Sequence, residues 1–326
     1  MKRFLQENKL YLITIVVIVA LFQIKLPYYI DAPGGTIDIS NRIEYDELEE
    51  YEGSLNMLYV TEYVATIPTY LLSYVIPNWD LEDISNNQIS NESAEEIEIR
   101  NKVMLQNSIN NAKYVAYQTA NKTIEVKERK SIVIGTILET DLKIGDEILE
   151  IDGEKVTDTS FIKKKIEEKN FGDKLKEKIK RKDKELEKIV EVKEQDNNKM
   201  LGVVIVTNYE FTTDPEIELK FKSSESGSSG GLMMALSIYS AISGEDILRG
   251  RKIAGTGTID MNGNVGEIGG IKYKIMGAAN DKMDVVLVPS ENYEEAKQVT
   301  AEKKYDLEIV EIKTFQDAID YLQKTT

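Results

Sequence analysis

Residues 220–243 read Lys-Phe-Lys-Ser-Ser-Glu-Ser-Gly-Ser-Ser-Gly-Gly-Leu-Met-Met-Ala-Leu-Ser-Ile-Tyr-Ser-Ala-Ile-Ser. The residues leading into this stretch, Glu216 to Lys222, alternate between polar and apolar side chains, which is the period of a half-buried strand. Beyond the glycines, apolar residues recur at helical spacing from Leu232 to Ile242. The pattern therefore predicts a strand, a loop of small residues and a helix.

The loop places Ser229 just before the first turn of the predicted helix. Unpaired backbone N–H groups and the positive end of the helix dipole lie there and can stabilise an anion, which suits a nucleophilic serine. A flexible surface loop and a helix N-cap are the alternative interpretations of the same residues. A phosphate-binding loop is not indicated, because Gly-x-x-x-x-Gly-Lys-Ser/Thr does not occur in the sequence.

A second stretch, residues 252–279, supports the catalytic interpretation. It predicts a strand through Ile259, a turn near Met261 to Asn264, and a helix that begins behind Gly269-Gly270 and carries Lys272 and Lys274. The chain contains no His and no Cys, which excludes Ser-His and Cys-His catalysis. Lysine is then the natural side-chain base, because burial disfavours the ammonium form. The two stretches together are compatible with a Ser-Lys dyad.

Four blocks of this region resemble the proteolytic domain of Lon-type serine peptidases. They are Gly-Ser-Ser-Gly-Gly-Leu-Met from Gly227, Thr-Gly-Thr-Ile-Asp from Thr256, Gly-Glu-Ile-Gly-Gly-Ile-Lys-Tyr-Lys ending at Lys274, and Val-Val-Leu-Val-Pro-Ser-Glu-Asn from Val285. The resemblance covers residues 201–326 and implies that Ser229 is the nucleophile, Lys274 the general base and Thr256 a supporting residue close to that lysine. Ser228, Gly230 and Ser226 depart from the family's Pro, Ala and Asp, which leaves Ser228 as an alternative nucleophile.

Residues 142–156 resemble the most recognisable block of a PDZ domain. They read Leu-Lys-Ile-Gly-Asp-Glu-Ile-Leu-Glu-Ile-Asp-Gly-Glu-Lys-Val, with turns expected at Gly145-Asp146 and Asp152-Gly153. The periodicity of residues 175–192 allows a helix as well as strands, and the resemblance favours two strands. The segment Lys127 to Lys130, expected as a loop before Ser131, lacks the apolar-Gly-apolar-Gly pattern that receives a C-terminal carboxylate. Strand addition along the groove edge is compatible with this sequence, whereas capture of a free C-terminus is left open.

The N-terminal 30 residues predict a transmembrane signal-anchor. A basic tip, residues 1–9, precedes the uncharged run Leu10 to Ile24, and Leu26 to Ile30 extend the apolar segment to roughly 20 residues, the length that crosses a bilayer of ~30 Å. No small-residue cleavage site follows, so an uncleaved anchor is expected in preference to a signal peptide. The basic tip would place the N-terminus in the cytoplasm and the catalytic domain outside the cell.

The expected fold is a multidomain α+β protein with an N-terminal transmembrane helix, a mainly-β PDZ domain and a Lon-type α/β proteolytic domain. The predicted ranges are 1–30 for the cytoplasmic tip and anchor, 31–121 for an extracellular strand and helix region that packs on the protease domain, 122–196 for the PDZ domain and 197–326 for the proteolytic domain. Ser93 to Glu96 fits a capping box at the start of a helix within the second range. The net charge of −16 argues against nucleic acid as a partner.

This order of segments resembles the membrane-anchored PDZ-containing Lon-like proteases of Gram-positive bacteria. The resemblance implies an ATP-independent serine endopeptidase of the cell membrane that cleaves secreted peptides or extracellular protein segments, without a metal or other cofactor. The alternative is a catalytically inert PDZ scaffold that recruits envelope proteins. A structural component of the wall is a third, weaker alternative.

Overall fold

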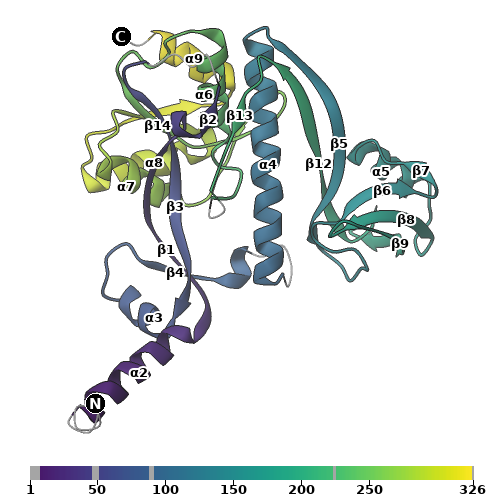
Figure 1. Cartoon of the computed structure of the whole chain (residues 1–326), viewed down its shortest axis with the longest axis horizontal. Coiled ribbons are helices and arrows are strands. Elements are labelled where there is room, and N and C mark those ends of the chain that lie inside the picture. Colours follow the sequence, from purple (N-terminus) through teal and green to yellow (C-terminus); the bar gives the residue numbers. More distant parts are fainter. Residues whose placement is uncertain (1–7, 46–50, 88–91, 223–224, 325–326) are drawn as a thin grey trace.

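The computed structural model describes residues 8–45, 51–87, 92–222 and 225–324. Its larger part, here called the large body, is built on a six-stranded sheet in the order β18-β17-β14-β3-β1-β4. β3, β14, β17 and β18 pair in parallel, whereas β1 pairs antiparallel with both β3 and β4. The strands are β1 (Lys25–Asp38), β3 (Ser54–Thr66), β4 (Asp80–Asp83), β14 (Lys252–Gly255), β17 (Val285–Pro289) and β18 (Glu308–Ile312) (Figure 1).

Both faces of this sheet are covered by helices. Because side chains alternate along a strand, Ile253 and Leu287 pack on one face while their neighbours Ala254 and Val286 pack on the other. The first face contacts α4 (Ala94–Thr119), α6 (Gly231–Ser243) and α9 (Phe315–Lys324), and the second contacts α7 (Ile271–Asn280) and α8 (Ser290–Lys303). This sandwich of helices around a largely parallel sheet confirms the mixed α/β character expected from the sequence.

Short elements complete the large body. β2 (Ile43–Glu44) pairs with β13 (Glu218–Leu219), and β15 (Thr258–Ile259) pairs with β16 (Val265–Gly266). The remaining elements are η1 (Ser40–Arg42), α3 (Ile67–Ser73) and η2 (Ile84–Asn87). The predicted capping box is confirmed at the start of α4, where Glu96 N donates to Ser93 Oγ and Ser93 N donates to the Glu96 carboxylate.

The smaller part, here called the small body, is an antiparallel sheet with its own core. Its central path runs β12-β5-β6-β8-β9, and its core includes Ile148, Leu175 and Ile179. The elements are β5 (Thr123–Thr136), β6 (Glu147–Ile151), β7 (Glu154–Lys155), α5 (Thr159–Glu167), β8 (Lys174–Arg181), β9 (Lys184–Glu191), β10 (Lys193–Gln195), β11 (Asn198–Met200) and β12 (Val203–Asp214). β8 and β9 confirm the two strands predicted for residues 175–192.

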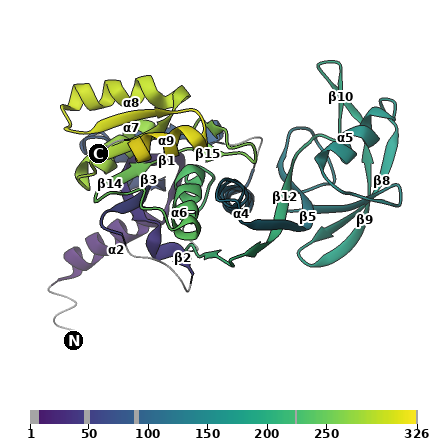
Figure 2. The same cartoon turned by 90° about the horizontal axis from the view of Figure 1, so that it is seen from above.

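β5 and β12 form a long ribbon that connects the small body to the large one. They pair from Thr123 opposite Asp214 to Thr136 opposite Val203. Leu201 to Thr207 are predicted to begin the catalytic domain, but in the structure β12 belongs to the small body's sheet, and Leu201 lies in that body's core. The small body is thus inserted between α4 and β13, and α4, seen end-on in Figure 2, separates α6 from the ribbon.

The predicted transmembrane anchor is wrong. The helix α2 (Lys9–Gln23) has 15 residues, and the backbone becomes a strand from Lys25, where β1 pairs with β3. At 1.5 Å per residue such a helix spans about 22 Å, less than the ~30 Å of a hydrocarbon core. Among the described ranges, no helix combines the length and apolar character that a bilayer crossing requires.

The single-pass placement in the cell membrane falls with that anchor, since both the cytoplasmic N-terminus and the extracellular catalytic domain were derived from it. The predicted membrane segment includes Leu26 to Ile30, but these residues belong to β1, where Ile30 is fully buried. The first seven residues of the basic tip lie outside the described part of the chain.

Candidate active site and peptide groove

The predicted nucleophile and base line the same cleft in the large body. This cleft has a volume of about 1100 Å³. One wall carries Ser229 and the glycines that precede α7, and Lys274 reaches it from α7 itself. The other walls come from β1, β3 and the N-terminal half of α4, which include Met57 and Asn101. The site is therefore assembled from segments that lie more than 100 residues apart in the sequence.

Ser229 lies one residue before the N-cap of α6. The helix begins at Gly231 with Gly230 as its N-cap, and Ser229 is partly exposed to the cleft. Within the described residues, the backbone N–H groups of Ser229 and Gly230 have no hydrogen-bond partner. The local geometry thus provides a hydroxyl and two available donors at the positive end of a helix, as the loop-helix pattern predicts.

Lys274 is buried on α7 without an opposite charge. Lys274 is only 3% exposed, and among the described residues no carboxylate forms an ion pair with it. Burial lowers the pKa of the Lys274 ammonium to about 8, because removal from water penalises the charged form. About a tenth of this lysine is then neutral at pH 7, and a general base acts in its neutral form.

Thr256 connects the lysine to the serine residue. Lys274 Nζ donates to Thr256 Oγ1 at 3.1 Å, and Thr256 Oγ1 donates to the Ser229 carbonyl at 3.0 Å. The backbone N–H of Gly257 donates to the same carbonyl at 2.7 Å. The structure therefore brings all three predicted site residues together, although within the described residues no hydrogen bond joins Lys274 Nζ to Ser229 Oγ.

Lys272, the other lysine of the same motif, is in a different environment. Its Nζ forms an ion pair with Asp80 at 2.5 Å, and its side chain is 39% exposed. The carboxylate of Asp80 also accepts a hydrogen bond from the Tyr273 hydroxyl at 2.6 Å. Lys272 is therefore exposed and engaged by a carboxylate, whereas Lys274 is buried in the cleft, so Lys274 is the lysine of this helix that suits a base.

The two glycines after Ser229 allow close approach of segments that sequence reasoning did not assign to the site. A Cβ at Gly230 would lie 1.9 Å from Met57 Sδ, and one at Gly231 would lie 2.8 Å from Ser108 Oγ. Ser108 Oγ also donates to the Ser228 carbonyl at 3.1 Å. The only sequence signal for this contact was the capping box that predicted α4, and it gave no indication of a role at the site.

Acidic side chains gather at another part of the same cleft. Asp31, Glu62 and Glu82 line it, and they come from β1, β3 and β4. Burial, the neighbouring Glu62 and a hydrogen bond with Glu82 raise the pKa of Asp31 to about 7. Burial and Glu82 also raise the pKa of Glu62. The cleft therefore carries pH-sensitive carboxyl groups as well as the serine and the lysine.

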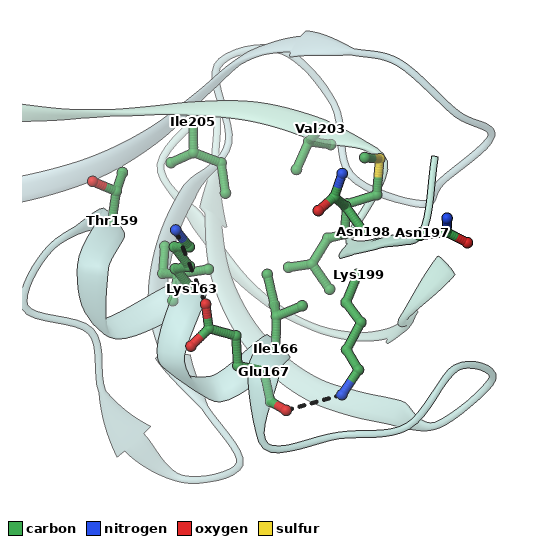
Figure 3. A pocket seen from close by; sticks show the side chains of 12 residues that line it. Thr159, Lys163, Ile166, Glu167, Asn197, Asn198, Lys199, Val203 and Ile205 are labelled. Carbon is green, nitrogen blue, oxygen red and sulfur yellow. Dashed lines mark hydrogen bonds and ion pairs between the residues drawn. The ribbon is translucent and has the colours of Figure 1, made fainter. Parts of the chain in front are cut away.

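A second groove lies in the small body, between α5 and β12. It has a volume of about 570 Å³ and is lined by Thr159, Ile162, Lys163, Ile166 and Glu167 of α5 and by Val203 and Ile205 of β12, among others (Figure 3). β12 is the edge strand of its sheet. Lys199 reaches the end of α5 and donates to the Glu167 carbonyl at 3.0 Å. The groove thus combines an apolar floor, a helix and a strand edge, the features that strand addition uses.

The loop expected at Lys127 to Lys130 does not border this groove. These residues lie within β5, where Lys130 pairs with Asn208 of β12. The turn that leads into the groove strand is instead Leu201-Gly202-Val203, in which Gly202 has a φ of +77°. The carboxylate-binding pattern is expected just before Ser131, in β5, but the strand that borders the groove is β12. The order of strands in space differs from their order along the chain.

Comparison with known proteins finds a family match for one segment of each body. Residues 216–324 match the family model of the Lon protease C-terminal proteolytic domain, and residues 124–192 match that of the PDZ domain. The Lon protease of Campylobacter jejuni is 33% identical over 96 residues, which are 29% of this chain and 12% of that protein. Lon protease 1 of Sorangium cellulosum is 36% identical over 93 residues, which are 28% of this chain and 11% of that protein.

Among solved structures, the PDZ domain of the SdrC-like protein from Listeria monocytogenes is similar to 25% of this chain, over 93% of its own length, with 23% identity and a TM-score of 0.24. The chain spans only 11–12% of the length of the two curated Lon proteases named above. Taken with the geometry of the cleft and the groove, the matches show that this chain carries a PDZ domain and a Lon protease C-terminal proteolytic domain, which suggests serine peptidase activity.

Proposed function

We propose that this protein is a serine endopeptidase that uses a Ser229-Lys274 dyad and needs no ATP. The observation that carries the proposal is the buried, unpaired Lys274, which lines the same cleft as Ser229 and is tied to its residue through Thr256. The chemistry requires only these side chains and water, and the sequence has no Gly-x-x-x-x-Gly-Lys-Ser/Thr loop for a nucleotide.

In the first half of the reaction, neutral Lys274 Nζ accepts the proton of the Ser229 hydroxyl while Oγ attacks the carbonyl carbon of a substrate peptide bond. The carbonyl oxygen becomes an oxyanion, which the free N–H groups at the start of α6 stabilise. Collapse of this intermediate breaks the C–N bond, and the Lys274 ammonium gives its proton to the leaving amine. An acyl-enzyme ester on Ser229 and neutral Lys274 remain.

In the second half, a water molecule gives a proton to Lys274 Nζ while the oxygen of this water attacks the ester carbon. The new oxyanion collapses, Ser229 Oγ leaves and takes the proton back from Lys274, and the product carboxylate is released. Thr256 Oγ1 holds Lys274 by accepting a hydrogen bond from Nζ, and the same hydroxyl donates to the Ser229 carbonyl.

We also propose an accessory function for the second groove, between α5 and β12 of the PDZ domain: it binds an extended segment of a peptide or protein. The free edge of β12 offers backbone N–H and C=O groups for strand addition, and Val203, Ile205 and Ile166 supply apolar contacts for alternate side chains. Binding there would hold a protein substrate on the enzyme while another segment enters the cleft.

The test is cleavage of an unfolded protein by the full chain, with the products identified by mass spectrometry. Ser229→Ala and Lys274→Ala should abolish cleavage and labelling by a fluorophosphonate probe, whereas Ser228→Ala should retain both. Retention of labelling in Ser229→Ala with loss in Ser228→Ala would move the nucleophile to Ser228. A wild-type protein that neither cleaves nor reacts with the probe would contradict the peptidase and favour the inert PDZ scaffold.

A further inference from the structure

The loop that carries Ser229 is held from outside the Lon-like segment. Residues 216–324 match the proteolytic domain, but two hydrogen bonds to this loop come from α4, which precedes the PDZ domain in the chain. Gly227 N donates to the Asn101 carbonyl at 3.2 Å, and Ser108 Oγ donates to the Ser228 carbonyl at 3.1 Å. α4 therefore holds two peptide units of the loop, the one between residues 226 and 227 and the one between residues 228 and 229.

The Ser228 carbonyl belongs to the same peptide unit as the Ser229 N–H. Because a trans peptide is planar, its C=O and N–H point in opposite directions. A carbonyl that faces Ser108 on α4 directs the Ser229 N–H away from that helix. Within the described residues this N–H has no partner, so it is available to an oxyanion.

The contact between Ser108 and the loop is built into the packing of α4 on α6. Ser108 is 3% exposed, and a Cβ at Gly231 would meet its Oγ at 2.8 Å and the Ile259 backbone N at 2.9 Å. Only a glycine at position 231 lets the two helices come this close. The Gly231 N–H donates to the same Ser228 carbonyl at 3.3 Å, so this oxygen has two donors.

We propose that Ser108 is a positioning residue that fixes the Ser228–Ser229 peptide plane and thereby aims the Ser229 N–H at the oxyanion. This inference rests on the proposed function, since it concerns the transition state of the Ser229 reaction. Without the Ser108 hydroxyl, the Gly231 N–H alone holds the carbonyl, and the peptide is free to rotate part of the time. The predicted defect is therefore in transition-state stabilisation and leaves substrate binding unchanged.

The experiment compares wild type, Ser108→Ala and Ser108→Cys in the full chain, with a fluorogenic peptide substrate and a peptide aldehyde that forms a hemiacetal with the nucleophile. Complete loss of one oxyanion donor costs about 100- to 1000-fold, so partial loss in Ser108→Ala should lower kcat about 10- to 100-fold with KM unchanged. Affinity for the aldehyde should fall by the same factor. Ser108→Cys keeps a weak donor and should lie between the two.

Asn107→Ala is the matched control. Asn107 is the neighbouring residue on α4. Its side chain donates to the Thr207 carbonyl of β12 at 3.1 Å and accepts from Asn111, and within the described residues it makes no hydrogen bond to the serine loop. This variant should keep kcat and aldehyde affinity within about twofold of wild type. A Ser108→Ala protein that is less stable but has unchanged kcat and aldehyde affinity would show that Ser108 is only structural.

The outcomes separate this inference from the proposed function. If Ser229→Ala is inactive while both Ser108 variants match wild type, the dyad stands and the positioning role is overturned. If Ser108→Ala loses kcat and raises KM equally, the residue shapes the substrate site and the inference is again wrong. If the wild-type protein does not react with the aldehyde at all, the proposed function fails and this inference fails with it.

Discussion

Among the residues that the structure describes, each of the two domains buries an ionisable side chain without an opposite charge. In the Lon-like domain it is Lys274, whose pKa burial lowers to about 8. In the PDZ domain it is Glu177 on β8, which is 0% exposed and has two carboxylate oxygens without a hydrogen-bond partner within the described residues. Burial, with Asp146 and Asp152 as secondary causes, raises the pKa of Glu177 to about 8.

The surroundings of these two groups differ. Lys274 lines the large cleft and is held by Thr256, which also contacts the Ser229 residue. Glu177 points to the same side of β8 as the core residues Leu175 and Ile179, and it lines neither the cleft nor the groove described above. A strongly shifted pKa therefore marks a candidate catalytic group only where a cleft and a nucleophile are also present.

The largest expected effect is the loss of activity in Lys274→Met. Methionine fills a similar volume but cannot accept a proton, so kcat should fall by at least about 1000-fold. The same variant should be more stable at pH 7, by roughly 2–3 kcal/mol, because the folded wild type must carry a buried charge below its pKa of about 8. Steady-state kinetics and chemical denaturation measure the two effects.

The sign of the stability effect follows from linkage. Between pH 8 and about 10.5 the unfolded wild type binds more protons than the folded one, so its free energy of unfolding increases as the pH rises. Above this window the charge of Lys274 no longer destabilises the wild type relative to the variant. Lys272→Met is the control, because it removes an exposed ion pair and should leave kcat nearly unchanged. An active Lys274→Met would remove the contrast between the two buried groups.

The second expected effect is a pH dependence of the wild-type reaction. Only neutral Lys274 can accept the serine proton, and burial lowers its pKa to about 8. kcat should therefore rise about tenfold per pH unit well below 8, roughly 50-fold from pH 6 to pH 8, and level off above it. Measurement of kcat at saturating substrate across this range tests the expectation. A flat profile between pH 6 and 8 would contradict lysine as the base.

The sequence predicts the core of the candidate site because its residues lie in local patterns. The strand-loop-helix around Ser229 and the glycines before Lys274 can be recognised from neighbouring residues alone. The absence of His and Cys then leaves lysine as the natural base. The roles of these residues stay predictions, but the structure does place Ser229 and Lys274 in one cleft and buries Thr256 behind it, hydrogen-bonded to both residues.

The remaining features depend on contacts between distant segments. The contact of Ser108 with Ser228 spans 120 residues, and no local pattern indicates it. The ribbon of β5 and β12 likewise pairs residues 123 and 214, so the strand that borders the PDZ groove could not be identified from the order of strands. Leu26 to Ile30 are apolar enough for a membrane helix or a buried strand, and only pairing with β3 decides between them.

The smallest expected effect concerns Glu177 and sharpens the comparison. Glu177→Met removes a carboxyl group that is buried beside the negative charges of Asp146 and Asp152. We expect the PDZ domain of this variant to gain roughly 2 kcal/mol of stability near pH 7, measured by denaturation of the full chain and followed by hydrogen exchange of β8. Peptidase activity should be unchanged.

The pH dependence distinguishes a buried carboxyl from general repacking. Because the folded-state pKa of Glu177 is raised from about 4.5 to about 8, the folded domain binds more protons in this window, and wild-type stability falls as the pH rises through it. Glu177→Met should remove this slope and match wild type below pH 4.5. Glu150→Met, on the neighbouring strand β6 and partly exposed, should leave the slope in place. If Glu177→Met instead lowered kcat, the PDZ core would be coupled to the cleft, and the two buried groups would belong to one functional unit.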